Sequence, residues 1–386
     1  MTRLPAEGWT TREDLARLVT ALGADNLRWV GGAVRDTLLG LPVKDIDAAT
    51  PLRPEDVAKA LAAAGIRTIP TGIAHGTLTA VLPHGPVEIT TLRHDVATDG
   101  RRATVAFALD WREDAARRDF TINALYAHPE TLEVSDFFGG LDDLAARRVR
   151  FIGDARERIR EDHLRILRYY RFQARFGSVI DPEGEDACAE LAPTLKGLSR
   201  ERVAMELLAL LGLPDPQPTL ARMAQRGVLA VVLPEADVAR LAPLLAAERA
   251  AQVPPDAIRR LAALLAPEPR PADQLAARLR LSTAQRKRLV RLATRSAPDA
   301  DPFALAYSEG PAMARDLLLL AGRDPAVLDG WTVPTFPLRG GAIVARGVAA
   351  GPDVARILRA VETRWIAEGF PEAARVEQLL ADELPR

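Results

Sequence analysis

The chain has 386 residues, too many for one ordinary hydrophobic core, so we expect two or three domains. Its single cysteine, Cys188, excludes an intramolecular disulfide and a cysteine-rich zinc site. The formal net charge is −1, no apolar stretch is long enough to span a membrane, and the N-terminus lacks the apolar core of a secretory signal. We therefore expect a cytoplasmic protein without membrane contact, and no feature points to an obligate protein partner.

The first part of the chain, over residues 1–145, is predicted to mix short helices with strands. Short apolar or alternating runs indicate the strands, and a leading proline with a trailing glycine bounds the clearest helix. In chain order the predicted elements are a strand at 27–30, a turn at 31–32, a short helix at 33–39, a strand around Ile46, a helix at 54–64, and a hairpin of 77–82 with 87–92. This mixture predicts an α+β head.

Strand signals nearly vanish beyond Asp154. Apolar residues recur at helical spacing from Asp154 to Phe176, which predicts a helix over that range. The remaining helical stretches are rich in alanine and leucine and are separated by proline clusters at 214–216, 254–255 and 267–271. The predicted fold class is thus an α+β head with a mixed or antiparallel sheet, followed by an all-α neck at 146–212 and an all-α body and tail at 213–386.

Two acids, Asp45 and Asp47, alternate on the predicted strand around Ile46. Side chains two residues apart on a strand share a face, and their Cα atoms lie about 6–7 Å apart. Two carboxylates at that spacing can hold Mg²⁺, which prefers oxygen ligands and keeps several waters. The alternative is an ordinary pair of acids on a solvated strand face.

Two glycines, Gly31 and Gly32, stand between the first predicted strand and the short helix. Such a turn lets phosphate oxygens approach backbone N–H groups, and Arg35 on the first helical turn can add a direct phosphate contact. The alternative is a tight strand–helix turn that carries an exposed arginine.

Asp162 and Arg165 are three residues apart in the helix predicted over 154–176, so they share one helical face. A carboxylate can accept from the exocyclic amino group of a base, while a guanidinium donates to its ring nitrogen or carbonyl oxygen. Cytosine and adenine carry that amino group, whereas uracil and guanine present a carbonyl in its place. The alternative is a plain intrahelical ion pair.

Positive charge is segregated along the chain. Between Arg147 and Arg175 there are ten arginines and four acids, and between Arg278 and Arg295 there are seven basic residues and no acid. Such clusters favour contact with the phosphates of a nucleic acid, with solvated helix faces as the alternative.

Four segments resemble, in order and in spacing, the signature of the class II tRNA nucleotidyltransferase and poly(A) polymerase family. These segments are 31–50, 117–125, 161–165 and 201–208. The resemblance extends over roughly residues 27–210, a little under half of the chain. It implies that 1–145 is a nucleotidyltransferase catalytic head, that 146–212 is a neck with a nucleotide-selecting motif, and that 213–386 binds tRNA.

The resemblance also implies an activity: addition of C, C and A to tRNA 3′ ends from CTP and ATP, with Mg²⁺ as the cofactor and pyrophosphate as the second product. Asp45 and Asp47 match the metal ligands. The implied nucleotide-binding residues are Gly32, Arg35, Arg118, Asp162, Arg165, Arg168 and Arg171. Glu88, on a neighbouring predicted strand, is the candidate third acid that activates the primer hydroxyl, and its alternative is an exposed residue of an alternating strand.

The segment 93–117 resembles the flexible loop of this family at full length, which favours complete CCA synthesis. A poly(A) polymerase is one alternative, but 69–76 lacks the basic segment typical of those enzymes. An enzyme limited to CC or to A addition is another. A non-catalytic RNA-binding protein is disfavoured because Asp45, Asp47, Glu88, Asp119 and Asp162 are all retained.

Overall fold

The computed structural model describes residues 2–73, 76–98, 103–108, 110–295 and 299–384, with the backbone alone for 94–98 and 103–106. Within these ranges the chain forms two compact units, Met1–Pro234 and Glu235–Arg386. Sheets occur in the first unit, and the described part of the second is helical. The predicted α+β head followed by an all-α remainder is thereby confirmed.

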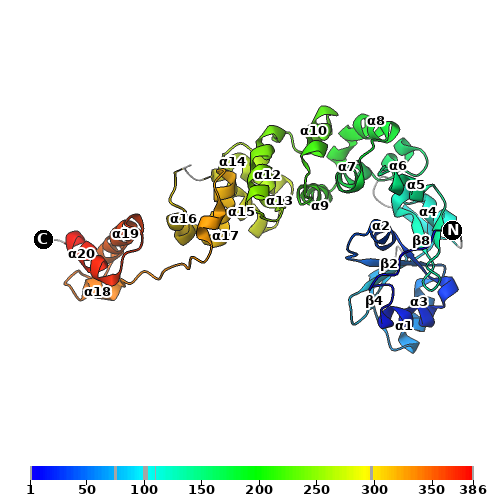
Figure 1. Cartoon of the computed structure of the whole chain (residues 1–386), viewed down its shortest axis with the longest axis horizontal. Coiled ribbons are helices and arrows are strands. Elements are labelled where there is room, and N and C mark those ends of the chain that lie inside the picture. Colours follow the sequence, from blue (N-terminus) through cyan, green and yellow to red (C-terminus); the bar gives the residue numbers. More distant parts are fainter. Residues whose placement is uncertain (1, 74–75, 99–102, 109, 296–298, 385–386) are drawn as a thin grey trace. The chain divides into compact units, whose positions relative to one another are not determined.

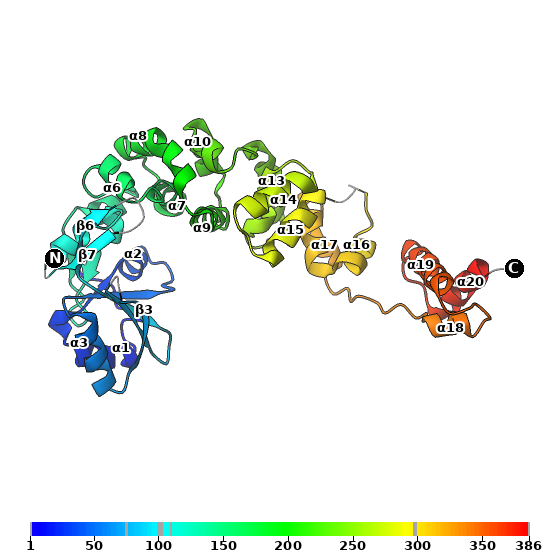
Figure 2. The ribbon, with the colours of Figure 1, turned by 180° about the vertical axis from the view of Figure 1, so that it is seen from behind.

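The larger sheet has seven strands in the order β3-β4-β5-β2-β1-β8-β9. They are β1 (Arg28–Val30), β2 (Ile46–Thr50), β3 (Arg67–Gly72), β4 (Thr77–Val81), β5 (Val87–Thr91), β8 (Leu125–Ala127) and β9 (Val134–Asp136). β2 and β5 run parallel, and every other neighbouring pair is antiparallel. β6 (Arg93–Thr98) and β7 (Ala103–Phe107) form a separate antiparallel ribbon (Figure 2).

The two faces of this sheet pack differently, as strand alternation requires. Trp29 meets Trp9 edge-on at 5.9 Å, whereas its neighbour Val30 joins a buried cluster with Ala49 and Tyr126. The helices of the head are α1 (Glu13–Leu22), α2 (Gly32–Leu38), α3 (Pro54–Ala63), α4 (Trp111–Ala116) and α5 (Gly140–Ala145), with 3-10 turns at Ala24–Asn26 and Thr121–Asn123. α2 packs on β1, β2 and β8, and α1 lies beside α3 (Figure 1).

The rest of the first unit is helical. It contains α6 (Ala155–Glu161), α7 (Arg165–Phe176), α8 (Pro182–Leu191), a 3-10 helix (Ala192–Gly197), α9 (Arg200–Leu211), α10 (Gln217–Gln225) and α11 (Val228–Val232). The prediction of one helix over 154–176 is wrong, because the helix ends at Glu161 and resumes at Arg165. Asp162 causes the break: its side chain accepts from Leu164 N–H at 3.1 Å, a local bond that competes with helix continuation.

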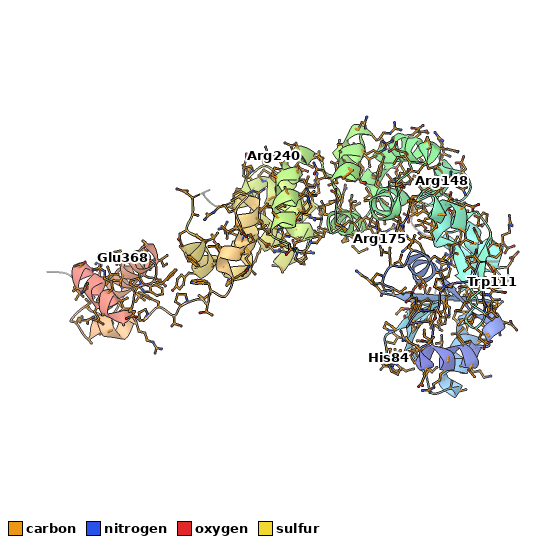
Figure 3. The ribbon with its side chains drawn as sticks, in the orientation of Figure 1. His84, Trp111, Arg148, Arg175, Arg240 and Glu368 are labelled. Atoms are coloured by element: carbon orange, nitrogen blue, oxygen red, sulfur yellow. The ribbon has the colours of Figure 1, made fainter. Side chains whose placement is uncertain are left out.

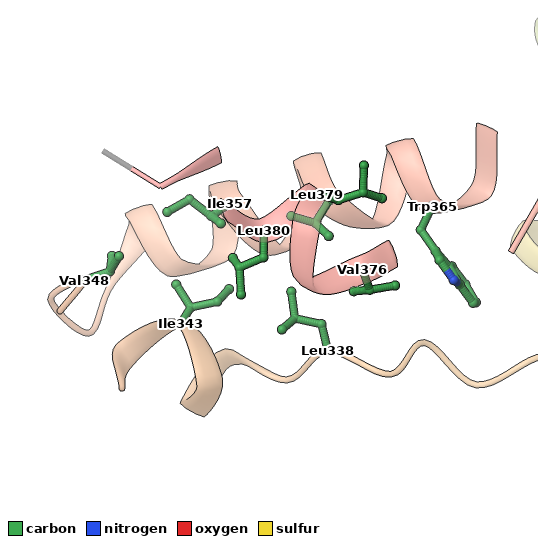
Figure 4. Close-up of a cluster of buried hydrophobic side chains, with 9 residues drawn as sticks. Leu338, Ile343, Val348, Ile357, Trp365, Val376, Leu379 and Leu380 are labelled. Carbon is green, nitrogen blue, oxygen red and sulfur yellow. The ribbon is translucent and has the colours of Figure 1, made fainter. Parts of the chain in front are cut away.

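The second unit contains α12 (Leu241–Ala250), α13 (Ala257–Leu264), α14 (Pro269–Arg278), α15 (Thr283–Thr294), α16 (Pro302–Glu309), α17 (Pro311–Leu320), α18 (Gly340–Val344), α19 (Pro352–Ala367) and α20 (Ala373–Glu383), with 3-10 turns at Val238–Arg240 and Pro325–Leu328. The last three helices share a buried cluster that includes Ile343, Trp365 and Leu380 (Figure 4). No described helix is long and apolar enough to cross a membrane.

Four charged side chains are buried where α12, α13 and α17 meet: Glu248, Arg259, Arg260 and Asp316, none more than 6% exposed. Arg259 donates to Glu248 Oε1 and to Asp316 Oδ1, both at 2.8 Å, and Arg260 donates to the second Glu248 oxygen at 2.9 Å. The attraction between opposite charges at these distances offsets the cost of removing them from water. Loss of one partner leaves the remaining buried charges without compensation.

We expect Arg259→Met to destabilise the second unit by about 3–5 kcal/mol, because it removes one cation from between two buried acids. Hydrogen exchange of the α13 amides in the full chain measures this loss. Arg286→Met is the matched control, since Arg286 meets Asp273 at 2.6 Å in a solvent-exposed pair, and such pairs contribute little to stability. Equal loss of protection in the two variants would contradict the prediction.

Candidate active site

One row of side chains crosses five strands of the larger sheet. The strand register pairs Tyr126 with Val30, Val30 with Asp47, Asp47 with Glu88, and Glu88 with Thr79. Residues paired across adjacent strands project from the same face, on backbones about 4.8 Å apart. Asp47 of β2 and Glu88 of β5 therefore lie side by side.

A third carboxylate, Asp45, lies two residues before Asp47. Asp45 and Glu88 are exposed, whereas Asp47 is partly buried. Burial, followed by the negative charges of Glu88 and Asp45, raises the pKa of Asp47 to about 6, although Arg118 acts in the opposite direction. The acids predicted at this site are thus close enough to repel one another, and a cation among them would relieve that repulsion.

These carboxylates fit an open Mg²⁺ site better than a site in which protein side chains supply every metal ligand. Among the described residues, no three His, Cys, Asp or Glu side chains converge as a complete metal-binding group. Mg²⁺ keeps several waters and is commonly held by one or two carboxylates together with substrate phosphates. Asp45 and Asp47, open to solvent on one side, offer that kind of platform.

Arg118 supplies fixed positive charge beside these acids. Its Nε donates to Tyr126 Oη at 2.9 Å and its Nη2 to Asp114 Oδ2 at 3.1 Å, while Tyr126 Oη donates to the same oxygen at 2.6 Å. Burial would raise the pKa of Asp114, but Arg118 and Arg117 outweigh it and hold that pKa at about 2. The Nη1 end of Arg118 lies near Gly31, 3.7 Å from where a Cβ would stand. Arg118 is thus held between the acids and the glycine turn.

Arg35 is buried, with 4% exposure, so the alternative of an exposed arginine at the glycine turn is wrong. Its Nε donates to Asp36 Oδ1 at 2.9 Å, its Nη1 to Asn123 Oδ1 at 2.5 Å, and its guanidinium lies 4.3 Å from the Phe176 ring. Asp36 also accepts from Arg175 of α7 at 3.0 Å, and Figure 3 labels Arg175 between the ribbons of α7 and α2. In this structure Arg35 connects the glycine turn to α7, and the predicted phosphate contact stays a prediction.

Arg168 of α7 is joined to the head through Asp119. Arg168 Nε donates to Asp119 Oδ2 at 2.8 Å, and the other oxygen of Asp119 accepts from Asn123 Nδ2 at 2.9 Å. Burial would raise the pKa of Asp119, but Arg168 and the Asn123 bond hold it at about 2. Asn123 thereby links Arg168 to Arg35, two of the predicted nucleotide-binding residues.

The alternative of an intrahelical ion pair between Asp162 and Arg165 is wrong, and so is the prediction that they share a helical face. Asp162 Oδ2 accepts from Arg202 Nη2 of α9 at 2.7 Å, while Arg165 Nη1 donates to Glu161 Oε2 at 2.6 Å. The two residues do not share a helical face, because the chain is not helical from Asp162 to Leu164. Arg165 Nη2 also donates to the carbonyl oxygen of Arg117 at 3.0 Å, which ties it to the segment that carries Arg118.

Several residues that organise this site were not identified from the sequence. Asp114, Asn123, Arg202 and Glu206 contact predicted site residues, and Arg175 contacts Asp36, the chain neighbour of Arg35. Four of them lie in or beside recognised segments. Asp114 lies four residues before Arg118, a spacing that could have indicated their ion pair. The other four each meet a partner distant in the chain, so no local spacing reveals those contacts. The part of the predicted loop at 99–102, and the side chains of 94–106, lie outside the described residues.

The basic stretch from Arg278 to Arg295 is largely paired with acids from other segments. The ion pairs are Arg278 with Glu235, Arg286 with Asp273, Arg288 with Asp256 and Asp316, and Arg291 with Glu309. Four of its seven basic residues therefore form ion pairs with acids from other segments. This surface is less positive than the sequence alone predicts.

Comparison with solved structures relates this fold to CCA-adding enzymes. A Bacillus stearothermophilus CCA-adding enzyme in complex with CTP has a TM-score of 0.77 and 29% identity, over 96% of this chain and 97% of its own. A Thermotoga maritima CCA-adding enzyme complexed with tRNA shares the fold, with a TM-score of 0.70 at 21% identity over 99% of this chain and 100% of its own.

Comparison of sequences decides the family. A model described as poly A polymerase head domain matches residues 27–150, and one described as a probable RNA and SrmB-binding site of polymerase A matches 179–240. The mitochondrial CCA tRNA nucleotidyltransferase 1 of Mus musculus is 33% identical over 383 residues, which cover 93% of this chain and 87% of the murine protein. The chain belongs to the tRNA nucleotidyltransferase and poly(A) polymerase family. The resemblance found in the sequence is confirmed, and the chain is a nucleotidyltransferase.

Other members of this family match over a shorter range. The human CCA tRNA nucleotidyltransferase 1 is 47% identical over 192 residues, and a CCA-adding enzyme of Streptococcus pneumoniae serotype 19F is 43% identical over 197. These matches span 48% and 50% of this chain, and 43% and 48% of those relatives. In both cases the chain matches somewhat less than half the length of the relative.

We expect Asp47→Asn to stabilise the metal-free protein at pH 8 by about 1–2 kcal/mol. The folded-state pKa of Asp47, about 6, lies above its ordinary value of 3.8, so the folded state binds this proton more tightly than the unfolded chain does. The resulting destabilisation is fully present above about pH 6 and is lost as the pH falls to about 4. Denaturant unfolding in a chelator at pH 8 and pH 4 measures it, with exposed Asp56→Asn as control. A variant less stable than wild type at pH 8 would refute it.

Proposed function

We propose that this chain adds C, C and A to the 3′ ends of tRNA from CTP and ATP and releases pyrophosphate. The observation that carries the proposal is the pairing of Asp47 with Glu88 on one sheet face, beside Asp45 and Arg118. Crowded acids next to a fixed arginine suit a reaction in which a metal-bound triphosphate meets a hydroxyl nucleophile. The name of the murine relative and the CTP bound to the B. stearothermophilus enzyme support this choice of reaction and nucleotide.

In this proposal Asp45 and Asp47 hold Mg²⁺. Two such ions, when bound, supply charge neutralisation for the triphosphate and make the primer 3′-hydroxyl more acidic. Glu88, in register with Asp47, accepts the proton of that hydroxyl. The 3′-oxygen forms a bond to the α-phosphorus, the bond from that phosphorus to the bridging oxygen breaks, and pyrophosphate leaves with the bond electrons.

The remaining residues of the head and α7 bind the nucleotide in this proposal. Arg118 meets the triphosphate directly, since its guanidinium lies beside both the acids and the glycine turn at Gly31 and Gly32. Arg168 and Arg171, each partly exposed on α7, add positive charge towards the same group. Arg35, which is buried, acts by holding the glycine turn in place.

Asp162 and Arg165 choose the base. Asp162 accepts from the exocyclic amino group that cytosine and adenine share, and Arg165 donates to a ring nitrogen or carbonyl of the base. Asp162 and Arg165 are not bonded to each other, so each is oriented by its own partners.

We propose that the protein acts in the cytoplasm, although the murine relative is named as mitochondrial.

Asp45→Ala is expected to reduce nucleotide incorporation by at least about a thousandfold, because it removes one of two carboxylates that hold the metal. Binding of tRNA should change little, since Asp45 lies on the nucleotide side of the site. Incorporation of labelled CTP measures the first effect and a filter-binding assay the second. Asp56→Ala, which removes an exposed acid of α3, is the control and should leave both unchanged. Normal incorporation by Asp45→Ala would refute the mechanism.

The reaction itself is tested with tRNA that lacks its 3′ CCA, supplied with each nucleoside triphosphate separately and then together. We expect two additions with CTP alone, none with UTP or GTP, and a third with CTP and ATP together. A long tract with ATP alone would identify a poly(A) polymerase instead. Addition that stops after CC, or that requires a CC end, would identify a partial enzyme, and no addition with tRNA binding retained would identify a non-catalytic RNA-binding protein.

A further inference from the structure

Helix α9 presents two opposite charges to the residues that we assign to nucleotide binding. Arg202 and Glu206 are four residues apart, so they lie on one face of α9. Arg202 Nη2 meets Asp162 Oδ2 at 2.7 Å, and Glu206 Oε2 accepts from Arg171 Nε at 2.5 Å. The charges are complementary in order: a cation faces the base-selecting acid, and an anion faces an arginine assigned to the triphosphate.

Asp162 is held at both carboxylate oxygens. Oδ1 accepts from Leu164 N–H at 3.1 Å, which fixes it to the turn between α6 and α7, and Oδ2 is held by Arg202. Each carboxylate oxygen can accept more than one hydrogen bond, so this hold orients the group and still leaves acceptor capacity for a base. Of the hydrogen bonds that Asp162 makes with described residues, only the one to Leu164 would limit rotation of the carboxylate without Arg202.

Arg165 is held by a different set of partners. Its Nη1 donates to Glu161 Oε2 at 2.6 Å and to the Arg158 carbonyl oxygen at 2.8 Å, and its Nη2 donates to the Arg117 carbonyl oxygen at 3.0 Å. None of these contacts involves α9. Within the described residues, the orientation of the acceptor therefore depends on Arg202 and that of the donor does not.

The pair of Arg202 and Asp162 is a poor candidate for a purely stabilising contact. Their side chains are 34% and 29% exposed, and ion pairs with that much access to water contribute little to stability. What the pair does specify is direction, because a guanidinium and a carboxylate approach each other in a restricted geometry.

We propose that Arg202 is a specificity-determining positioning residue, which aims the free acceptor sites of Asp162 at the amino group of cytosine and adenine. This inference rests on the proposed function, because it assumes that Asp162 meets the base. Glu206 provides a contrast on the same helix. It holds arginines assigned to the triphosphate, which all four nucleotides share, so its loss should weaken every nucleotide alike.

The test compares Arg202→Met, Arg202→Lys and Glu206→Gln by kcat/KM for CTP and UTP on tRNA that lacks CCA, and by titration of each nucleotide without tRNA. Arg202→Met should lower the CTP to UTP ratio about ten- to a hundredfold, the range that a hydrogen bond to a charged group supports. Arg202→Lys should give an intermediate ratio, because it keeps the charge and loses the fork. Glu206→Gln should raise KM for both nucleotides and leave their ratio unchanged.

Arg200→Met is the matched control, since Arg200 begins the same helix and its side chain donates to the Lys196 carbonyl oxygen, away from Asp162. It should keep the wild-type ratio. An unchanged ratio in Arg202→Met, or an equal loss for both nucleotides, would overturn the inference. If Arg202→Met does not fold, as judged by its melting temperature, the ratio in Arg202→Lys decides. Failure of the wild type to add C to tRNA would instead reject the proposed function.

Discussion

The parallel, in-register pairing of β2 with β5 is the constraint on which the site depends. It sets Asp47 beside Glu88 on one sheet face, and Asp45 adds a third negative charge. Burial of Asp47, followed by this crowding of negative charge, raises its pKa to about 6, so the charged form is unfavourable in the absence of a cation. The negative charges therefore cost the folded protein stability, as is expected at a site that binds cations. Arg118, held by Tyr126 and Asp114, is the neighbouring cation that reduces this cost.

Most arginines near the site are positioned by acids from other elements. Asp119 holds Arg168, Asp36 holds Arg175, and Glu206 holds Arg171. A guanidinium held by one such contact keeps further N–H donors for a ligand, because it carries five in a planar fork. The basic clusters in the sequence are therefore oriented groups rather than a diffuse positive field, and in the second unit many of them are simply neutralised.

Much of the head was predictable because its signals are local. The strand before Gly31, the helix that starts at Pro54 and the hairpin of β4 with β5 all follow from patterns within a few residues. The parallel pairing of β2 with β5 was not, since it joins segments separated by a helix and two other strands. The same limit applies to Asp162: its spacing from Arg165 predicted a shared helical face, but its ion-pair partner, Arg202, comes from a helix that follows later in the chain.

The buried setting of Arg35 has a consequence for how the protein forms during translation. Its guanidinium lies against the Phe176 ring, and the adjacent Asp36 is paired with Arg175, both from α7. The ribosome releases the whole sheet of the head before these residues emerge. Until α7 is made, Arg35 lacks the cover of the Phe176 ring, and Asp36 has only one of its two arginine partners among the described residues. The packing around the glycine turn is therefore completed only once the neck has been synthesised.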